Sequence, residues 1–187
     1  YPKQLRKDFQ YLKRLYNLKP LQKHIWKFLR LRPSNFPTIR LAQLAAIMSM
    51  EVKLFSKIIE AKSAKAIRDL FDAEVSPYWK QHYVFDKYSE RGNAHLGTPT
   101  KNILLINAVC PVLFAYGKYK DNEGVCNRAL QLLLDCRTEK NAIISGWENL
   151  GLISRNASQS QALLQLKNEY CNNFRCTDCA IGAKILQ

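Results

Sequence analysis

The sequence predicts an all-α fold, a single compact multi-helix domain that spans residues 1–187 and ends in a cysteine-containing C-terminal tail. Apolar residues recur at the spacing of helix faces along most of the chain. The two-residue alternation of a β-strand never persists for more than a few residues. With 187 residues, of which 47% are hydrophobic, the chain is long enough to bury a core without disulfides.

Residues 1–40 predict two basic amphipathic helices. An apolar stripe in steps of four, three and four residues runs through Leu5, Phe9, Leu12 and Tyr16. The opposite face of this helix is basic and carries Lys3, Arg6, Lys7, Lys13 and Arg14. Pro20 opens the second predicted helix. The apolar side of that helix holds Leu21, Ile25, Phe28 and Leu29.

The positive charge of the chain is concentrated in this front segment. The sequence has 29 Lys and Arg against 15 Asp and Glu, a net charge of +14. Residues 1–40 hold eleven Lys and Arg against one acid, Asp8, and so contribute +10. Such a surface favours polyanions, because phosphate binding releases condensed counterions. The residues expected to contact nucleic acid are Lys23, Lys27, Arg30, Arg32 and Arg40. The alternative is a solvated face, or one that docks on an acidic partner domain.

Two prolines, Pro33 and Pro37, mark a rigid turn before a helix predicted over residues 37–50. This helix is apolar nearly all round, which predicts that it is buried. Its polar exceptions, Arg40 and Gln43, lie three residues apart on one face. A buried arginine needs a partner, so a structural hydrogen bond to the neighbouring turn is a second interpretation for Arg40.

Short helices are predicted near residues 54–61 and 64–71, and residues 74–97 form the least regular stretch. That stretch interleaves aromatic and basic side chains, namely Trp79, Lys80, His82, Tyr83, Lys87, Tyr88 and Arg91. The rings either stack on unpaired bases or pack the loop onto its own domain. His95 and Arg91 are further candidates for an enzyme site that forms only with another part of a longer protein.

A Thr98-Pro99 pair marks the start of a mostly apolar central helix. We expect this helix to cover residues 101–116, to kink at Pro111 and to end at Gly117. Further helices are predicted over residues 122–137, from about 143 to 150, and from a capping box at 158–161 to Cys171.

Three of the six cysteines, Cys171, Cys176 and Cys179, fall in the tail 171–187 with the spacing C-x4-C-x2-C. Thiolates at this spacing can share a zinc ion or an iron–sulfur cluster, each of which normally takes four protein ligands. The fourth ligand would be a histidine or one of Cys110, Cys126 and Cys136. Packed free thiols that stabilise the tail are the alternative, because cysteine is often buried.

The sequence predicts no active site within this chain. The three histidines lack the spacing of a metalloprotease, and the acids form no pair suited to general acid–base work. No segment is long and apolar enough to span a bilayer, and the N-terminus lacks the apolar region of a secretory signal. We therefore expect a cytoplasmic protein without a membrane partner. The first residue, Tyr1, suggests a fragment of a longer protein.

Four sequence segments resemble one known family. They are KPLQKHIWKFLRLRPSNFPTIRLAQLA (19–45), NILLINAVCPVLFAYG (102–117), SQALLQLKNEYC (160–171) and CTDCAIG (176–182). Together they resemble the C-terminal half of an uncharacterised bacterial family, domain-of-unknown-function family 2851, over most of residues 11–187. The family pattern covers Arg30, Arg32, Arg40, Gln43, Asn107, Cys171, Cys176 and Cys179.

The resemblance implies a missing N-terminal half with motifs similar to the PD-(D/E)XK nuclease core, which would carry any metal-dependent phosphodiester chemistry. The leading hypothesis is therefore a non-catalytic helical domain of a nuclease-like protein that binds nucleic acid through its basic front face. The alternative is a structural or protein-interaction domain that docks on the missing half. In that case a cysteine-bound metal or free thiols stabilise the tail.

Overall fold

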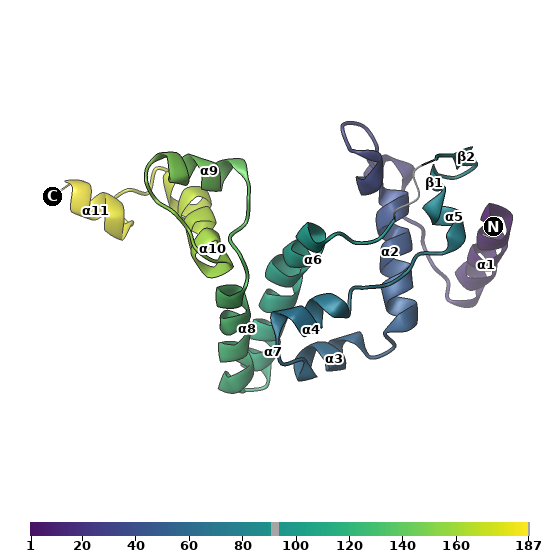
Figure 1. Cartoon of the computed structure of the whole chain (residues 1–187), viewed down its shortest axis with the longest axis horizontal. Coiled ribbons are helices and arrows are strands. Elements are labelled where there is room, and N and C mark those ends of the chain that lie inside the picture. The colour runs from purple at the N-terminus through teal and green to yellow at the C-terminus, as the bar shows by residue number, and fades with distance from the viewer. Residues whose placement is uncertain (91–93, 187) are drawn as a thin grey trace. The chain divides into compact units, whose positions relative to one another are not determined.

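The computed structural model describes residues 1–90 and 94–186. The chain is mostly helical, which confirms the predicted all-α class, and adds a small two-stranded hairpin (Figure 1). Contacts group it into two compact units. Unit 1 is Tyr1–Leu54 with Asp69–Gly97, and unit 2 is Phe55–Arg68 with Thr98–Gln187. The prediction of a single domain over residues 1–187 stays a prediction. Arg91, a candidate for an enzyme site, lies outside the described residues.

Unit 1 is built around helix α2 and a short hairpin. Its elements are α1 (Pro2–Leu15), the 3-10 turns η1 (Lys23–Ile25) and η2 (Pro33–Asn35), α2 (Pro37–Met50), α5 (Pro77–Lys80), β1 (His82–Val84) and β2 (Lys87–Tyr88). A core cluster joins Ile39 of α2 to Val75, Trp79 and Ala94. This core connects the helix to the segment that carries the hairpin.

The hairpin was not predicted from the sequence, because its strands are too short for a period-two pattern to emerge. Its antiparallel strands pair His82 with Tyr88, and Asp86 takes a positive φ of 58° in the turn. Aspartate tolerates this left-handed conformation better than most residues. The Thr38 hydroxyl donates a hydrogen bond to the Tyr83 carbonyl, which ties β1 to the first turn of α2.

The prediction of a helix that starts at Pro20 is wrong, because only the 3-10 turn η1 forms there. The apolar residues that suggested it find little to pack against, and Leu29 is 89% exposed. Short helices draw most of their stability from a packed apolar face, so this stripe does not suffice. Arg30 also adopts a positive φ of 62°, which ends any right-handed helix.

Helix α2 has the predicted bounds but is not buried all round. Its buried positions are Ile39, Gln43 and Ile47, which are spaced by four and lie on one face. Its exposed face carries Leu41, Leu44 and Met48. The uniformly apolar composition therefore concealed a two-sided helix.

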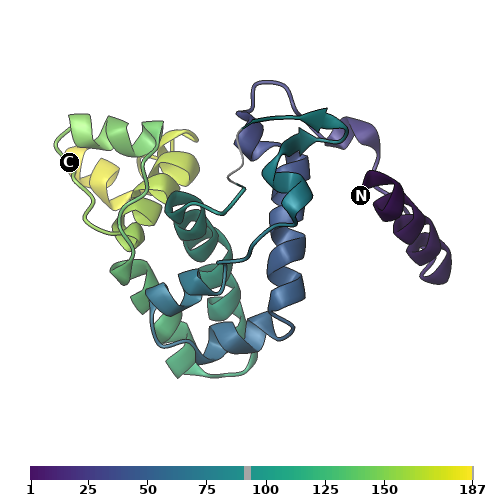
Figure 2. The same cartoon turned by 45° about the vertical axis from the view of Figure 1, so that its right-hand side comes forward.

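Unit 2 is a helical assembly that contains most of α3 and α4. Its elements are α3 (Leu54–Glu60), α4 (Ala64–Asp69), α6 (Thr98–Leu104), the π-helical turn η3 (Leu105–Val109), α7 (Cys110–Tyr119), α8 (Glu123–Asp135), α9 (Ala142–Asn149), α10 (Ala157–Gln165), the π-helical turn η4 (Leu166–Cys171) and α11 (Ala180–Leu186). Helices α7 and α8 lie side by side (Figure 1 and Figure 2).

The central helix of unit 2 runs without a break from Thr98 to Tyr119 through α6, η3 and α7. By length and composition, this 22-residue stretch could cross a membrane, so the expectation that no segment is long and apolar enough to do so is wrong. A core helix meets the same criteria, and here Leu105 and Leu113 are fully buried. The π-helical turn ends at Val109, two residues before Pro111, where the ring removes one backbone donor. The absence of a membrane partner stays a prediction.

Gly117 does not end this helix, as the sequence suggested, but lies where α7 meets α8. A Cβ at Gly117 would lie 2.7 Å from the Cys126 sulfur and 2.9 Å from the Cys126 backbone nitrogen. Glycine is therefore required there for close approach. Downstream, α8, α9 and α10 each start with an asparagine N-cap, namely Asn122, Asn141 and Asn156. Helix α10 thus begins before the capping box predicted at residues 158–161.

Arg128 of α8 holds the end of α3. Its guanidinium donates to the carbonyl oxygen of Ile58 at 2.7 Å and to those of Ile59 and Ala61. The last carbonyls of a helix lack intrahelical partners and carry partial negative charge, so a cation suits this place. Partial burial lowers the pKa of the Arg128 guanidinium.

The Gly117→Ala substitution should lower the free energy of unfolding by about 1–3 kcal/mol, since the added methyl overlaps Cys126. Gly146→Ala in α9 is the matched control, because a Cβ there meets nothing within 4 Å. It should raise stability by up to about 1 kcal/mol through helix propensity. Urea unfolding followed by circular dichroism measures both. Equal effects of the two substitutions would contradict the close-packing interpretation.

Candidate functional site

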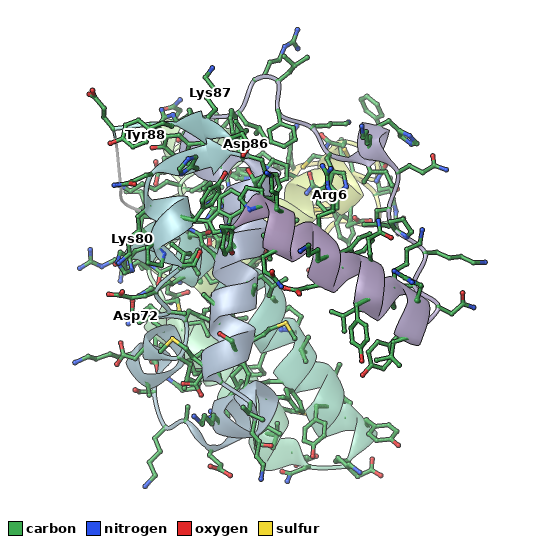
Figure 3. The ribbon with its side chains drawn as sticks, turned by 90° about the vertical axis from the view of Figure 1, so that its right-hand side faces the viewer. Arg6, Asp72, Lys80, Asp86, Lys87 and Tyr88 are labelled. Carbon is green, nitrogen blue, oxygen red and sulfur yellow. The ribbon has the colours of Figure 1, made fainter. Side chains whose placement is uncertain are left out.

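The basic face of α1 lines an open groove of about 890 Å³ in unit 1. The groove residues are Tyr1, Pro2, Lys3, Arg6, Lys7, Gln10, Tyr11, Arg14 and Asp86. Those from Lys3 to Arg14 recur every three or four positions, which places them on one helix face. Four cations thus face the groove, against a single carboxylate from the hairpin. Figure 3 labels one of these cations, Arg6, and the hairpin residue Asp86.

An aromatic column holds the start of α1 against the hairpin segment. The Tyr1 ring stacks on Tyr78 with centroids 4.7 Å apart, and the Tyr1 hydroxyl accepts a hydrogen bond from Trp79 Nε1 at 3.2 Å. Tyr78 in turn stacks on His82 at 4.0 Å. Its hydroxyl accepts the backbone N–H of Asp86 at 2.9 Å, which positions Asp86 beside the groove.

The groove cations keep their charge available for a ligand. Among the described residues, none of Lys3, Arg6 and Lys7 takes part in an ion pair. The acid of α1, Asp8, does not line the groove and accepts a hydrogen bond from Gln4 at 2.8 Å. The groove therefore presents positive charge to solvent.

The cations predicted to contact nucleic acid fall into two groups, four exposed residues before α2 and Arg40 within α2. Lys23, Lys27, Arg30 and Arg32 are all exposed, in the segment between α1 and α2. They do not line the groove. The groove cations were visible in the sequence as the basic face of the first helix. Their shared cavity could not be inferred, because it depends on the unpredicted hairpin.

Arg40 belongs to a structural hydrogen-bond network. Its guanidinium donates to Asn35 Oδ1 at 2.6 Å and to Gln43 Oε1 at 2.9 Å. The buried Gln43 passes the link on by donating to the Ala94 carbonyl at 2.7 Å. Partial burial lowers the pKa of the Arg40 guanidinium. This is the structural bond to the neighbouring turn that the sequence offered as the second interpretation, and a phosphate contact by Arg40 stays a prediction.

The aromatic residues of 74–97 mainly pack unit 1. Trp79 is buried in the core, and Tyr83 packs against the same cluster. Tyr88 differs, since it is 63% exposed and meets His82 edge-on. His95 lies near Glu74, and the Lys80 side chain together with His95 lowers the pKa of the Glu74 carboxyl.

The three tail cysteines line one small cavity of about 140 Å³ in unit 2. The turn η4 delivers Cys171 to it, and Gly182 of α11 packs so closely on the Cys176 carbonyl that no Cβ fits. Arg175 closes the loop between them, with its guanidinium 5.2 Å from the Tyr170 ring centroid. The local spacing therefore does bring the cysteines to a common cavity.

A complete metal site is not formed by these residues. Within the described ranges no three His, Cys, Asp or Glu side chains are arranged to hold a metal ion. The predicted sources of a fourth thiolate, Cys110, Cys126 and Cys136, are buried and do not line this cavity. The cysteines of the chain are free thiols. Zinc or an iron–sulfur cluster stays a prediction, and the chemistry of the cavity fits packed thiols.

Residues 1–142 match the family described as "Protein of unknown function (DUF2851)", and the chain belongs to this family. The match is shifted from the predicted extent of 11–187 and leaves Cys171, Cys176 and Cys179 outside it. It includes the whole of unit 1 and its groove. No curated protein matches the chain. No solved structure matches it either.

The Arg40→Met substitution should lower the free energy of unfolding by about 1–3 kcal/mol, because it leaves the buried Gln43 amide oxygen without its donor. Arg32→Met removes the same charge from an exposed position and should change stability by less than about 0.5 kcal/mol. Thermal and urea unfolding measure both variants. A fully stable Arg40→Met protein would show that the network is not structural.

Alkylation of the native protein should separate the cysteines into two classes. Burial, with Cys136 nearby, raises the pKa of the Cys110 thiol to about 12, and burial also raises the pKa of Cys136. The thiolate is the reactive form, so iodoacetamide at about pH 8 should modify Cys176 and spare Cys110 and Cys136. Mass spectrometry of tryptic peptides reads the result, with urea-unfolded protein as the control. Equal rates at Cys110 and Cys176 would overturn this assignment.

Proposed function

We propose that this chain is the non-catalytic, C-terminal helical half of a longer bacterial, nuclease-like protein, and that its basic N-terminal face binds nucleic acid. The observation that supports this is the groove along α1, where Lys3, Arg6, Lys7 and Arg14 face one solvent-accessible space with Asp86 as the opposing charge. Phosphate groups are the ligands that such a row of cations suits best.

The row of cations follows the helix axis, which is the arrangement that a polyanion requires. Lys3 and Arg14 are eleven residues apart and therefore lie roughly 16 Å apart along α1. A small anion would use one or two of these charges, whereas a nucleic-acid backbone meets all of them in succession. The exposed Lys23, Lys27, Arg30 and Arg32 would extend the basic surface beyond the groove.

A docking role on the missing N-terminal half is the second candidate, and apolar exposure favours it. Helix α1, all of which is described, buries none of its side chains, and its apolar stripe includes Phe9 at 40% exposure. The outward face of α2, with Leu41, Leu44 and Met48, is likewise exposed. In this candidate the apolar faces are covered by protein, and nucleic acid does not bind to unit 1.

Fluorescence anisotropy of a labelled DNA duplex across a salt series tests the proposal. Affinity should fall steeply as salt rises, because binding releases counterions from the DNA and this release becomes less favourable at high salt concentration. Lys7→Gln should weaken binding and reduce the log–log salt slope by about 0.9. Lys13→Gln removes the same charge from the same helix outside the groove and should have the smaller effect. A protein that binds neither the duplex nor a single-stranded oligonucleotide at low salt would contradict the proposal and favour docking.

A further inference from the structure

The α1 groove contains aromatic rings as well as cations. Tyr11 lines it and is 64% exposed, and Tyr1 lines it and is 49% exposed. Tyr11 lies four residues after Lys7 and three before Arg14, on the same face of the helix. Its ring is therefore flanked by a positive charge one turn to either side.

The two rings differ in how firmly they are held. Tyr1 is fixed by its stack on Tyr78 and by the bond from Trp79 Nε1 to its hydroxyl. Among the described residues, Tyr11 has neither a ring contact nor a side-chain hydrogen bond. Tyr11 is thus a ring that a ligand can cover without displacing a protein partner.

An alternation of cations and open aromatic rings distinguishes single strands from duplexes. Both forms offer phosphates, but only an unpaired base offers its flat face to a tyrosine ring. A ring in a groove that bound duplex alone would gain nothing from stacking, since the base faces are already covered. An acidic peptide would likewise bind to the cations but would offer no base to stack on the tyrosine ring.

We infer that the groove binds single-stranded nucleic acid, with Tyr11 as the stacking surface for an unpaired base and Lys7 and Arg14 on the flanking phosphates. This inference rests on the proposed function and adds the class of ligand. The segment 74–97, where the sequence placed possible stacking residues, has a different role, because its aromatic column anchors Tyr1 at the end of the groove.

The test compares three labelled probes on the full chain by anisotropy, namely oligothymidine, a duplex of the same length and an abasic oligonucleotide that has phosphates without bases. Tyr11→Ala should weaken oligothymidine binding about tenfold, which is typical for the loss of one stacked base. Binding of the duplex and of the abasic probe should not change. Tyr11→Phe should keep the affinity, because it keeps the ring.

Tyr16→Ala is the matched control. Tyr16 is 65% exposed, follows the same helix and does not line the groove, so its loss should leave all three affinities unchanged. Circular dichroism checks that each variant folds. If the protein binds oligothymidine and duplex alike and Tyr11→Ala behaves like Tyr16→Ala, nucleic-acid binding stands and the stacking inference is overturned. If the wild type binds none of the probes, or binds polyglutamate as tightly as oligothymidine, both proposals fail.

Discussion

The contact between Tyr1 and Trp79 is the interaction on which the groove depends. Trp79 is buried in the core of unit 1, and a buried indole N–H needs an acceptor. The Tyr1 hydroxyl supplies it, while the Tyr1 ring stacks on Tyr78. Because α1 buries no side chain of its own, this contact at its start fixes the helix beside the hairpin. As a result, the basic face of α1 and Asp86 of the hairpin line one groove. Without this contact the basic face would be surrounded by solvent alone.

The same rule, that buried polar groups must be paired, shapes the rest of each unit. In unit 1 it explains why Arg40 and Gln43 are embedded in an otherwise apolar helix, since their chain of bonds ends on the Ala94 carbonyl. In unit 2 it explains Arg128, which completes the carbonyls at the end of α3. These arginines contribute to the positive composition of the chain, but their charge is committed to the fold. Net charge is therefore a poor guide to which cations can meet a ligand, and the groove residues are better candidates.

The sequence predicted correctly those helices that are marked by strong local signals. The apolar stripe and basic face of residues 2–15, and the proline turn before α2, led to helices close to those observed. The failures share one cause, which is that periodicity does not say whether a partner surface exists. The stripe after Pro20 finds little to pack against and forms only η1, and Gly117 marks a close helix contact instead of a helix end. For the cysteines, the spacing alone indicated a shared location, and Cys171, Cys176 and Cys179 do line one cavity.

The sequence by itself determined the helical class, the basic front segment and the clustering of the tail cysteines, because these depend on residue type and on spacing within a few turns. Only the tertiary structure decided which charges share a groove, because that requires residues far apart in the chain to come together. Tyr1 stacks on Tyr78, and Arg6 and Asp86 line the same groove. The tertiary structure also decided that Tyr11, which no motif marks, stands open among the cations. Stacking chemistry needs a ring with an uncovered face, and the exposure of a side chain is set by what packs around it.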